Sequence, residues 1–237
     1  VPMYSGDSPN IYPIGTTNTT RPTLFSDSDK VSYFTPRFAG FQLGGSYVPN
    51  ASEEAGGTGN AYSPPQIEMG RNSGYSIAGN YVNKLGGVDV AVSAGYNSVD
   101  VTAATAGGGA DLKDMTQWSV GTQVGFAGFT VGGGYAESSD LGGAAGFDNE
   151  TYSLGVTYGM GPWKVGVQYS NQEQDYSAAI ADGELEIWTV GGQYTLGPGI
   201  TAFGGVQFYD NSLTTNAASA AAASSVGLAD DSTIIFI

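Results

Sequence analysis

The sequence predicts an all-β fold, a transmembrane antiparallel β-barrel, and three observations lead to this prediction. Apolar residues alternate with Gly, Ser, Thr, Asn or Gln along most of the chain, and strand side chains switch faces with every residue. Tight turns that contain Gly alternate with long polar segments, which is the hairpin pattern of such barrels. Aromatic residues lie near the ends of the apolar faces, as interfacial aromatics do in membranes.

The alternation starts at residues 31–47, VSYFTPRFAGFQLGGSY, where two alternating runs flank a break that contains Pro and Gly. This pattern predicts a hairpin with one aromatic and aliphatic face and one small, polar face. By the same criterion the chain holds about 11 strands. The further alternating segments are 75–81, 88–97, 117–126, 129–135, 152–158, 163–170, 188–196, 200–208 and 232–237.

The connections between these segments alternate in length. Five are predicted as tight turns, because each has Gly where a short turn needs a positive φ or a close approach. They are RFAGF, KLGGV, FAGF, GMGPW and LGPGI. The others are predicted as long extracellular loops, near residues 49–73, 98–115, 137–150, 171–183 and 210–231.

Composition excludes several classes of protein. The 237 residues include 38 Gly but no Cys and no His, so thiolate metal sites and histidine acid–base chemistry are absent. No apolar run approaches the roughly 20 residues of a membrane-spanning helix. The net charge of −15 argues against nucleic acid as a partner, since phosphate binding needs clustered Lys and Arg. We expect no enzymatic activity and no cofactor.

The small polar face predicts the lining of a wide, wet barrel. A barrel of about eight strands is filled by its side chains, whereas one of about 16 leaves an aqueous channel. A soluble β-sandwich would also alternate, but its solvent face usually carries charge, and this face has little. The predicted pore-lining residues are Gln42, Ser46, Asn80, Ser93, Asn97, Gln123, Ser153, Thr157, Gln168, Gln193 and Gln207. The predicted aromatic girdle consists of Tyr81, Trp118, Tyr158, Trp163, Trp188, Tyr194 and Phe208.

The hairpin at residues 31–47 resembles one in the general porins of Gram-negative bacteria, especially those of alphaproteobacterial type. Their pattern is V-x-Y-x-[ST]-P-x-F-x-G-[FL]-x-x-G-x-x-Y. The resemblance implies an outer-membrane homotrimer with barrels of about 16 strands, in contact with lipid and lipopolysaccharide. It also implies that the chain is incomplete at both ends, with residues 1–30 as the distal part of an inward-folded constriction loop and 31–237 as barrel.

We therefore expect passive diffusion of small hydrophilic solutes and ions. The alternative is a non-conducting barrel that serves as a surface scaffold or adhesin. The acidic excess predicts a modest preference for cations. Within the constriction loop, Asp7, Asp27 and Asp29 could be acidic groups at the narrowest part of the pore, the eyelet, or simple turn residues. Four carboxylates could bind structural Ca²⁺ or could be solvated loop charges. They are Asp111, Asp114, Glu184 and Glu186.

Overall fold

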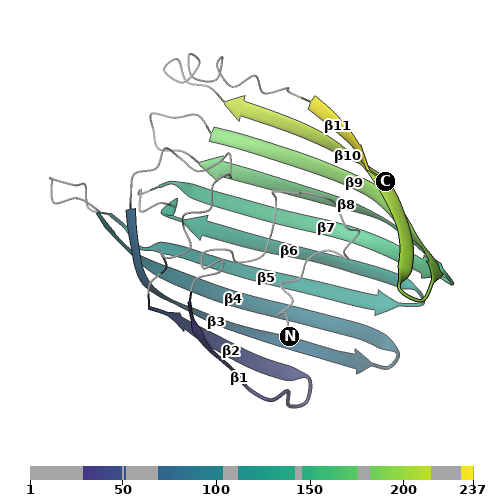
Figure 1. Ribbon diagram of the computed structural model, residues 1–237, viewed down its shortest axis with the longest axis horizontal. Coiled ribbons are helices and arrows are strands. Elements are labelled where there is room, and N and C mark those ends of the chain that lie inside the picture. The colour runs from purple at the N-terminus through teal and green to yellow at the C-terminus, as the bar shows by residue number, and fades with distance from the viewer. Residues whose placement is uncertain are drawn as a thin grey trace.

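The strands form one antiparallel sheet. The computed structural model describes residues 29–49, 51, 69–103, 112–141, 146–175, 182–214 and 231–236. Its 11 strands follow one another in sequence order, from β1 to β11 (Figure 1). Their bounds are β1 Val31–Phe34, β2 Phe41–Val48, β3 Met69–Leu85, β4 Val88–Ala103, β5 Met115–Phe126, β6 Phe129–Ser139, β7 Asp148–Met160, β8 Trp163–Asp175, β9 Asp182–Gly197, β10 Ile200–Thr214 and β11 Asp231–Phe236.

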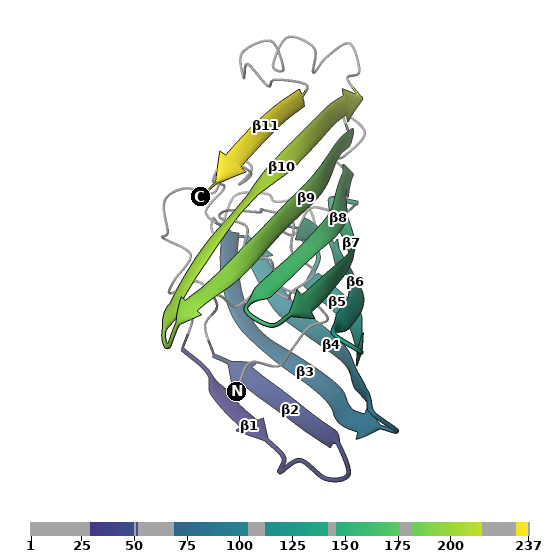
Figure 2. The ribbon, with the colours of Figure 1, turned by 90° about the vertical axis from the view of Figure 1, so that its right-hand side faces the viewer.

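The sheet is curved and has two edges. Figure 2 shows an open trough whose edges are β1 and β11. Within the described strands, β1 pairs with β2 and β11 pairs with β10. The predicted all-β antiparallel fold and the count of about 11 strands are confirmed, whereas the complete barrel of about 16 strands stays a prediction. In the described part of the chain no helix has the length and apolar character to cross a membrane.

All five predicted tight turns connect neighbouring strands. Two residues join β3 to β4 and two join β5 to β6. Ala127 and Gly128 both have positive φ, of 51° and 85°, as a two-residue turn matched to the twist of a hairpin requires. Gly86 and Gly87 do the same between β3 and β4. The turns therefore end each hairpin where the sequence places Gly.

Several strands extend beyond their predicted ends. The alternation predicts a strand over residues 75–81, whereas β3 covers Met69–Leu85, and β9 begins at Asp182 rather than near residue 188. The predicted loops are correspondingly too long. Apolar alternation marks only the part of a strand with one apolar face, but backbone pairing continues into polar sequence, because ladder hydrogen bonds do not depend on side-chain polarity.

The two faces of the sheet differ in exposure. We call the face that carries Leu43 and Leu154 the apolar face, and the opposite face, which carries Gln42 and Gln207, the polar face. Leu43 is 60% exposed and Leu154 61%, whereas Gln207 is 0% exposed. Side chains converge on the inside of a curved sheet and diverge on the outside. The polar face therefore lies on the concave side and most of the large apolar side chains point outward, although the register places Ile187 and Phe203 on the polar face.

Candidate functional site

The predicted pore-lining residues share the polar face. The pairing places Gln42 opposite Asn80 and Asn80 opposite Ser93, so that neighbouring strands contribute neighbouring polar groups. The same register carries the other eight onto this face. Those eight are Ser46, Asn97, Gln123, Ser153, Thr157, Gln168, Gln193 and Gln207.

Hydrogen bonds link these side chains across strands. The Asn97 Nδ2 donates to Gln117 Oε1 at 3.4 Å, and the Gln117 Nε2 donates to Ser138 Oγ at 2.9 Å. Farther along the sheet, Gln207 Nε2 donates to Thr189 Oγ1 at 3.2 Å. These bonds satisfy buried polar groups and hold their rotamers.

Arg37 is a further residue of this face that the sequence pattern does not predict. It lies in the turn before β2, and its guanidinium donates to the backbone oxygen of Gly40 at 2.6 Å. It also donates to Gln42 Oε1 at 3.0 Å and to Asn80 Oδ1 at 2.6 Å. A turn residue has no strand parity from which its face could be predicted. An Arg beside two predicted lining positions places a fixed positive charge at the turn end of the polar face.

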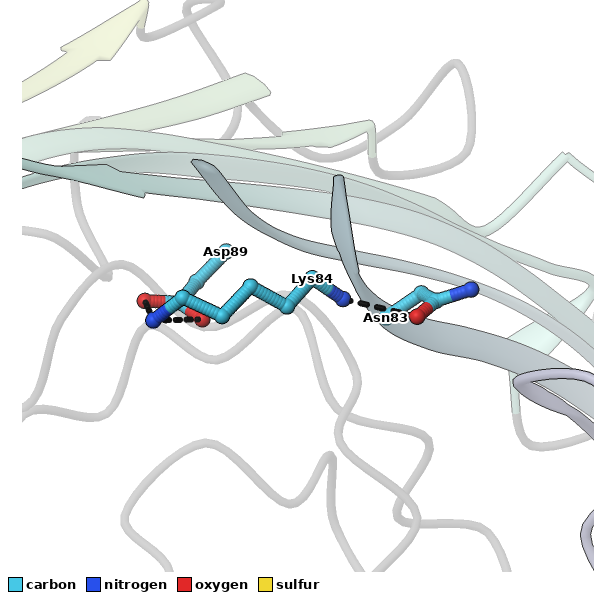
Figure 3. Close-up of polar contacts among 3 residues, drawn as sticks. All are labelled: Asn83, Lys84 and Asp89. Carbon is cyan, nitrogen blue, oxygen red and sulfur yellow. Dashed lines mark hydrogen bonds and ion pairs between the residues drawn. The ribbon is translucent and has the colours of Figure 1, made fainter. Parts of the chain in front are cut away.

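The other charged side chains of this face also lie near the turns. Lys84 and Asp89 stand opposite each other on β3 and β4, with Nζ and Oδ1 3.3 Å apart (Figure 3). Both side chains are 65% exposed, so this pair contributes little to stability. Lys164 shares the face through its pairing with Gln193. Together with Arg37, these groups give the described polar face more positive than negative charge.

At the long-loop end, the polar face becomes apolar. Val48, Val99 and Met115 are at most 2% exposed and pack into one cluster. Ala51 and Val101 complete its buried part, and Leu112 and Leu141 pack against it. The predicted small, polar face therefore does not extend to the loop-side ends of these strands. Val99 and Val101 follow the same parity as Asn97 and continue β4 into the segment predicted as a loop, near residues 98–115.

Aromatic side chains form two bands on the apolar face. The turn-side band contains Phe41–Tyr81, Phe129–Tyr158 and Trp163–Tyr194, with ring centroids 4.4–4.5 Å apart. The loop-side band contains Tyr75–Tyr96, Trp118–Tyr135 and Tyr152–Tyr169–Trp188, with centroids 4.8–6.2 Å apart, and Phe208 pairs with Trp188. All seven predicted girdle residues belong to these bands.

The bands run obliquely across the strands. We call residues that are paired directly across successive strands a register row. Tyr81 on β3 shares a row with Trp188 on β9. The turn-side band, which contains Tyr81, passes through Tyr194 on β9, six residues from Trp188. Six residues span about 20 Å of strand, and the six spacings from β3 to β9 span about 29 Å. The bands therefore cross the rows at about 35°, which matches the strand tilt of membrane barrels, about 35–45°.

The acidic side chains of the strands lie mainly on the apolar face, beyond the loop-side band. Among those that the structure describes, Asp89 alone lies on the polar face. The others are Asp100, Glu137, Asp148, Glu150, Glu173, Asp175, Glu184, Glu186 and Asp210. The predicted cation preference assumed that such groups surround the ion path, so the described strands give it no support.

The remaining predicted residues are scattered. Asp29 is exposed and precedes β1, whereas Asp7 and Asp27 lie outside the described residues. Of the Ca²⁺ candidates, Asp111 is also outside, Asp114 is exposed before β5, and Glu184 and Glu186 lie on β9. The described residues contain no group of three or more acidic side chains that could hold a metal ion.

Comparison with known proteins identifies the family. A family model described as Gram-negative porin matches residues 3–215. The chain belongs to the Gram-negative porin family. Over 116 residues, the porin is 33% identical to the "Major outer membrane protein" of Pasteurella multocida, a match that covers 48% of this chain and 29% of that protein. The resemblance noted at residues 31–47 is confirmed, and the protein is one of the bacterial outer membrane.

Solved structures support the fold. The anion-selective porin from Comamonas acidovorans is 20% identical and superposes with a TM-score of 0.53, over 77% of this chain and 49% of that one. A loop-deletion form of OmpT from Vibrio cholerae is 19% identical and gives a TM-score of 0.55, over 90% and 67%. The porin spans about half the length of the Comamonas protein and under a third of the Pasteurella protein.

Proposed function

We propose that this porin lets small hydrophilic solutes and ions diffuse passively through a water-filled pore lined by the polar face. The observation that carries the proposal is the composition of that face between the two aromatic bands. From β2 to β8 its register rows contain Gly, Ser, Thr, Ala, Asn and Gln, together with Lys164 beside the turn-side band. One row, for example, contains Gly121, Gly134, Ser153 and Ser170. Such side chains offer hydrogen bonds to water and leave space.

The apolar face supports the same proposal. Its side chains remain exposed although they are large, with Leu154 at 61% and Val190 at 49%. An exposed apolar surface of this extent marks contact with lipid or another protein. With lipid outside, the concave side of the sheet is the side away from the membrane, where polar groups need water or partners.

Membership of the porin family supports a proposal for the complete assembly. A homotrimer of barrels of about 16 strands, surrounded by lipid and lipopolysaccharide, is the arrangement that we infer for the whole protein. Within it, residues 1–30 would form the distal part of the constriction loop, and no catalytic residue is assigned. A scaffold or adhesin barrel remains the alternative function, and the small side chains of the polar face favour the pore.

Planar-bilayer recording tests the proposal. The protein expressed from its complete gene, added to a bilayer in KCl, should give stable, ohmic conductance steps. Heat-denatured protein at the same concentration is the control. An absence of steps from correctly folded protein would favour the scaffold function.

A further inference from the structure

A row of carboxylates crosses four strands just beyond the loop-side aromatic band. Glu137 pairs with Glu150, Glu150 with Glu173, and Glu173 with Glu184, so that each stands directly opposite the next. We call these four residues the carboxylate row. Glu186, also on β9, lies two residues nearer the aromatic band and opposite Asn171.

This arrangement is unfavourable without a counter-charge. Like charges directly opposite on neighbouring strands are destabilising, and the adjoining membrane weakens the screening by water. The side chains that contact these carboxylates in the described residues are neutral. Trp118 Nε1 donates to Glu137 at 3.1 Å, and Tyr169 Oη donates to Glu186 at 2.6 Å.

An unpaired polar atom lies in the same place. Asn171 is 0% exposed, and its Nδ2 donates to Glu184 Oε1 at 2.7 Å. Its Oδ1 is buried and has no hydrogen-bond partner. Because Oδ1 and Nδ2 are bonded to the same carbon atom, this oxygen lies beside Glu184. Asn171 also precedes Glu173 by two residues, so that both side chains lie on the same face of β8. A buried amide oxygen without a donor is destabilising.

We propose that Glu173, Glu184 and the Asn171 amide oxygen bind a divalent cation, with Ca²⁺ as the best fit. Carboxylate and amide oxygens are the ligands of hard cations, and Ca²⁺ accepts six to eight of them in flexible geometry. No group of three or more described acidic side chains could hold a metal ion, so the proposed shell consists of two carboxylates, the amide oxygen and water. A bound cation removes the like-charge repulsion and supplies the partner that Oδ1 lacks.

The site differs from the Ca²⁺ candidates that the sequence suggested. Glu184 is retained, and Asn171 and Glu173 are added from the neighbouring strand through their register with β9. Asp114 and Glu186 are left out, and Asp111 lies outside the described residues. The site faces away from the polar face, so the proposal does not rest on conduction.

A pair of titrations tests the proposal. Urea unfolding of the folded protein in uncharged detergent should be followed in EDTA and in millimolar CaCl₂, with NaCl added to equal ionic strength. Wild-type protein should unfold at higher urea in Ca²⁺. The variant Glu173→Gln removes one charge and keeps the side-chain shape. It should be at least as stable as wild type in EDTA and less stable than wild type in Ca²⁺.

Asp100→Asn is the matched control, because Asp100 is a carboxylate of the apolar face on β4, hydrogen-bonded to Ser73 at 3.0 Å and outside the row. This variant should gain as much from Ca²⁺ as wild type does. Equilibrium dialysis with radioactive Ca²⁺ should show at least tenfold weaker binding to Glu173→Gln than to wild type. The same stability order in both solutions, or equal Ca²⁺ binding by the two proteins, would overturn the site.

Discussion

Placing one arginine on each face of a single strand measures which face contacts lipid. Leu154 and Ser153 are neighbours on β7, with Leu154 on the apolar face and Ser153 on the polar face. Leu154 is 61% exposed and lies between Tyr152 and Tyr158 of the two bands. Across the ladders, Ser153 stands between Gly134 and Ser170, so a long side chain there has room.

The structure sets the expected magnitudes. An Arg near the middle of the lipid-facing band costs about 2–4 kcal/mol, so Leu154→Arg should reduce the folding equilibrium constant by about 30-fold to 900-fold. Ser153→Arg should cost less than about 1 kcal/mol, since its guanidinium meets water.

Urea unfolding in phosphatidylcholine vesicles, followed by Trp fluorescence, measures both changes. Ser153→Asn and Leu154→Val serve as controls for substitution itself. Equal losses from the two arginines, or a greater loss from Ser153→Arg, would refute the assignment of the faces.

Three further predictions concern charge and turns. Replacing Lys164 with Gln should move the reversal potential in a KCl gradient in the direction of greater cation selectivity. The shift should be larger in dilute salt, because the Debye length grows from about 10 Å to about 30 Å. Glu173→Gln, on the opposite face, should leave the reversal potential unchanged. Ala127→Gly should raise the free energy of unfolding by about 1 kcal/mol, seen as a higher urea midpoint. Ala127 has a φ of 51°, which is strained for a residue with a Cβ. An unchanged midpoint would argue against this turn geometry. Gly133→Ala should lower stability by about 1–3 kcal/mol, since its Cβ would lie 2.8 Å from a backbone oxygen on the next strand. Gly159→Ala, whose nearest contact would be at 3.9 Å, should be tolerated, and equal effects of the two would contradict the register.

Local features allowed most of the fold to be predicted from the sequence. A period of two identifies a strand without knowledge of its neighbours, and Gly86–Gly87 identifies a turn by its own conformational needs. The predicted strand ends were wrong for β3 and β9 because apolar alternation stops before backbone pairing does.

Features that depend on register could not be predicted in the same way. Glu173 and Glu184 lie 11 residues apart in the sequence, and only the pairing of β8 with β9 brings them together. The oblique course of the aromatic bands likewise needs the register of seven strands. The acidic excess gave the sign of the net charge but not the face on which the charges lie.

The most direct test of the pore uses a single cysteine, because the sequence contains none. Ser153→Cys and Leu154→Cys should each be recorded in a planar bilayer while a charged, water-soluble methanethiosulfonate reagent is added. The reagent should change the conductance of Ser153→Cys in discrete steps and leave Leu154→Cys unchanged. An unchanged conductance for Ser153→Cys, with labelling verified by mass, or an equal change for Leu154→Cys, would contradict a pore lined by the polar face.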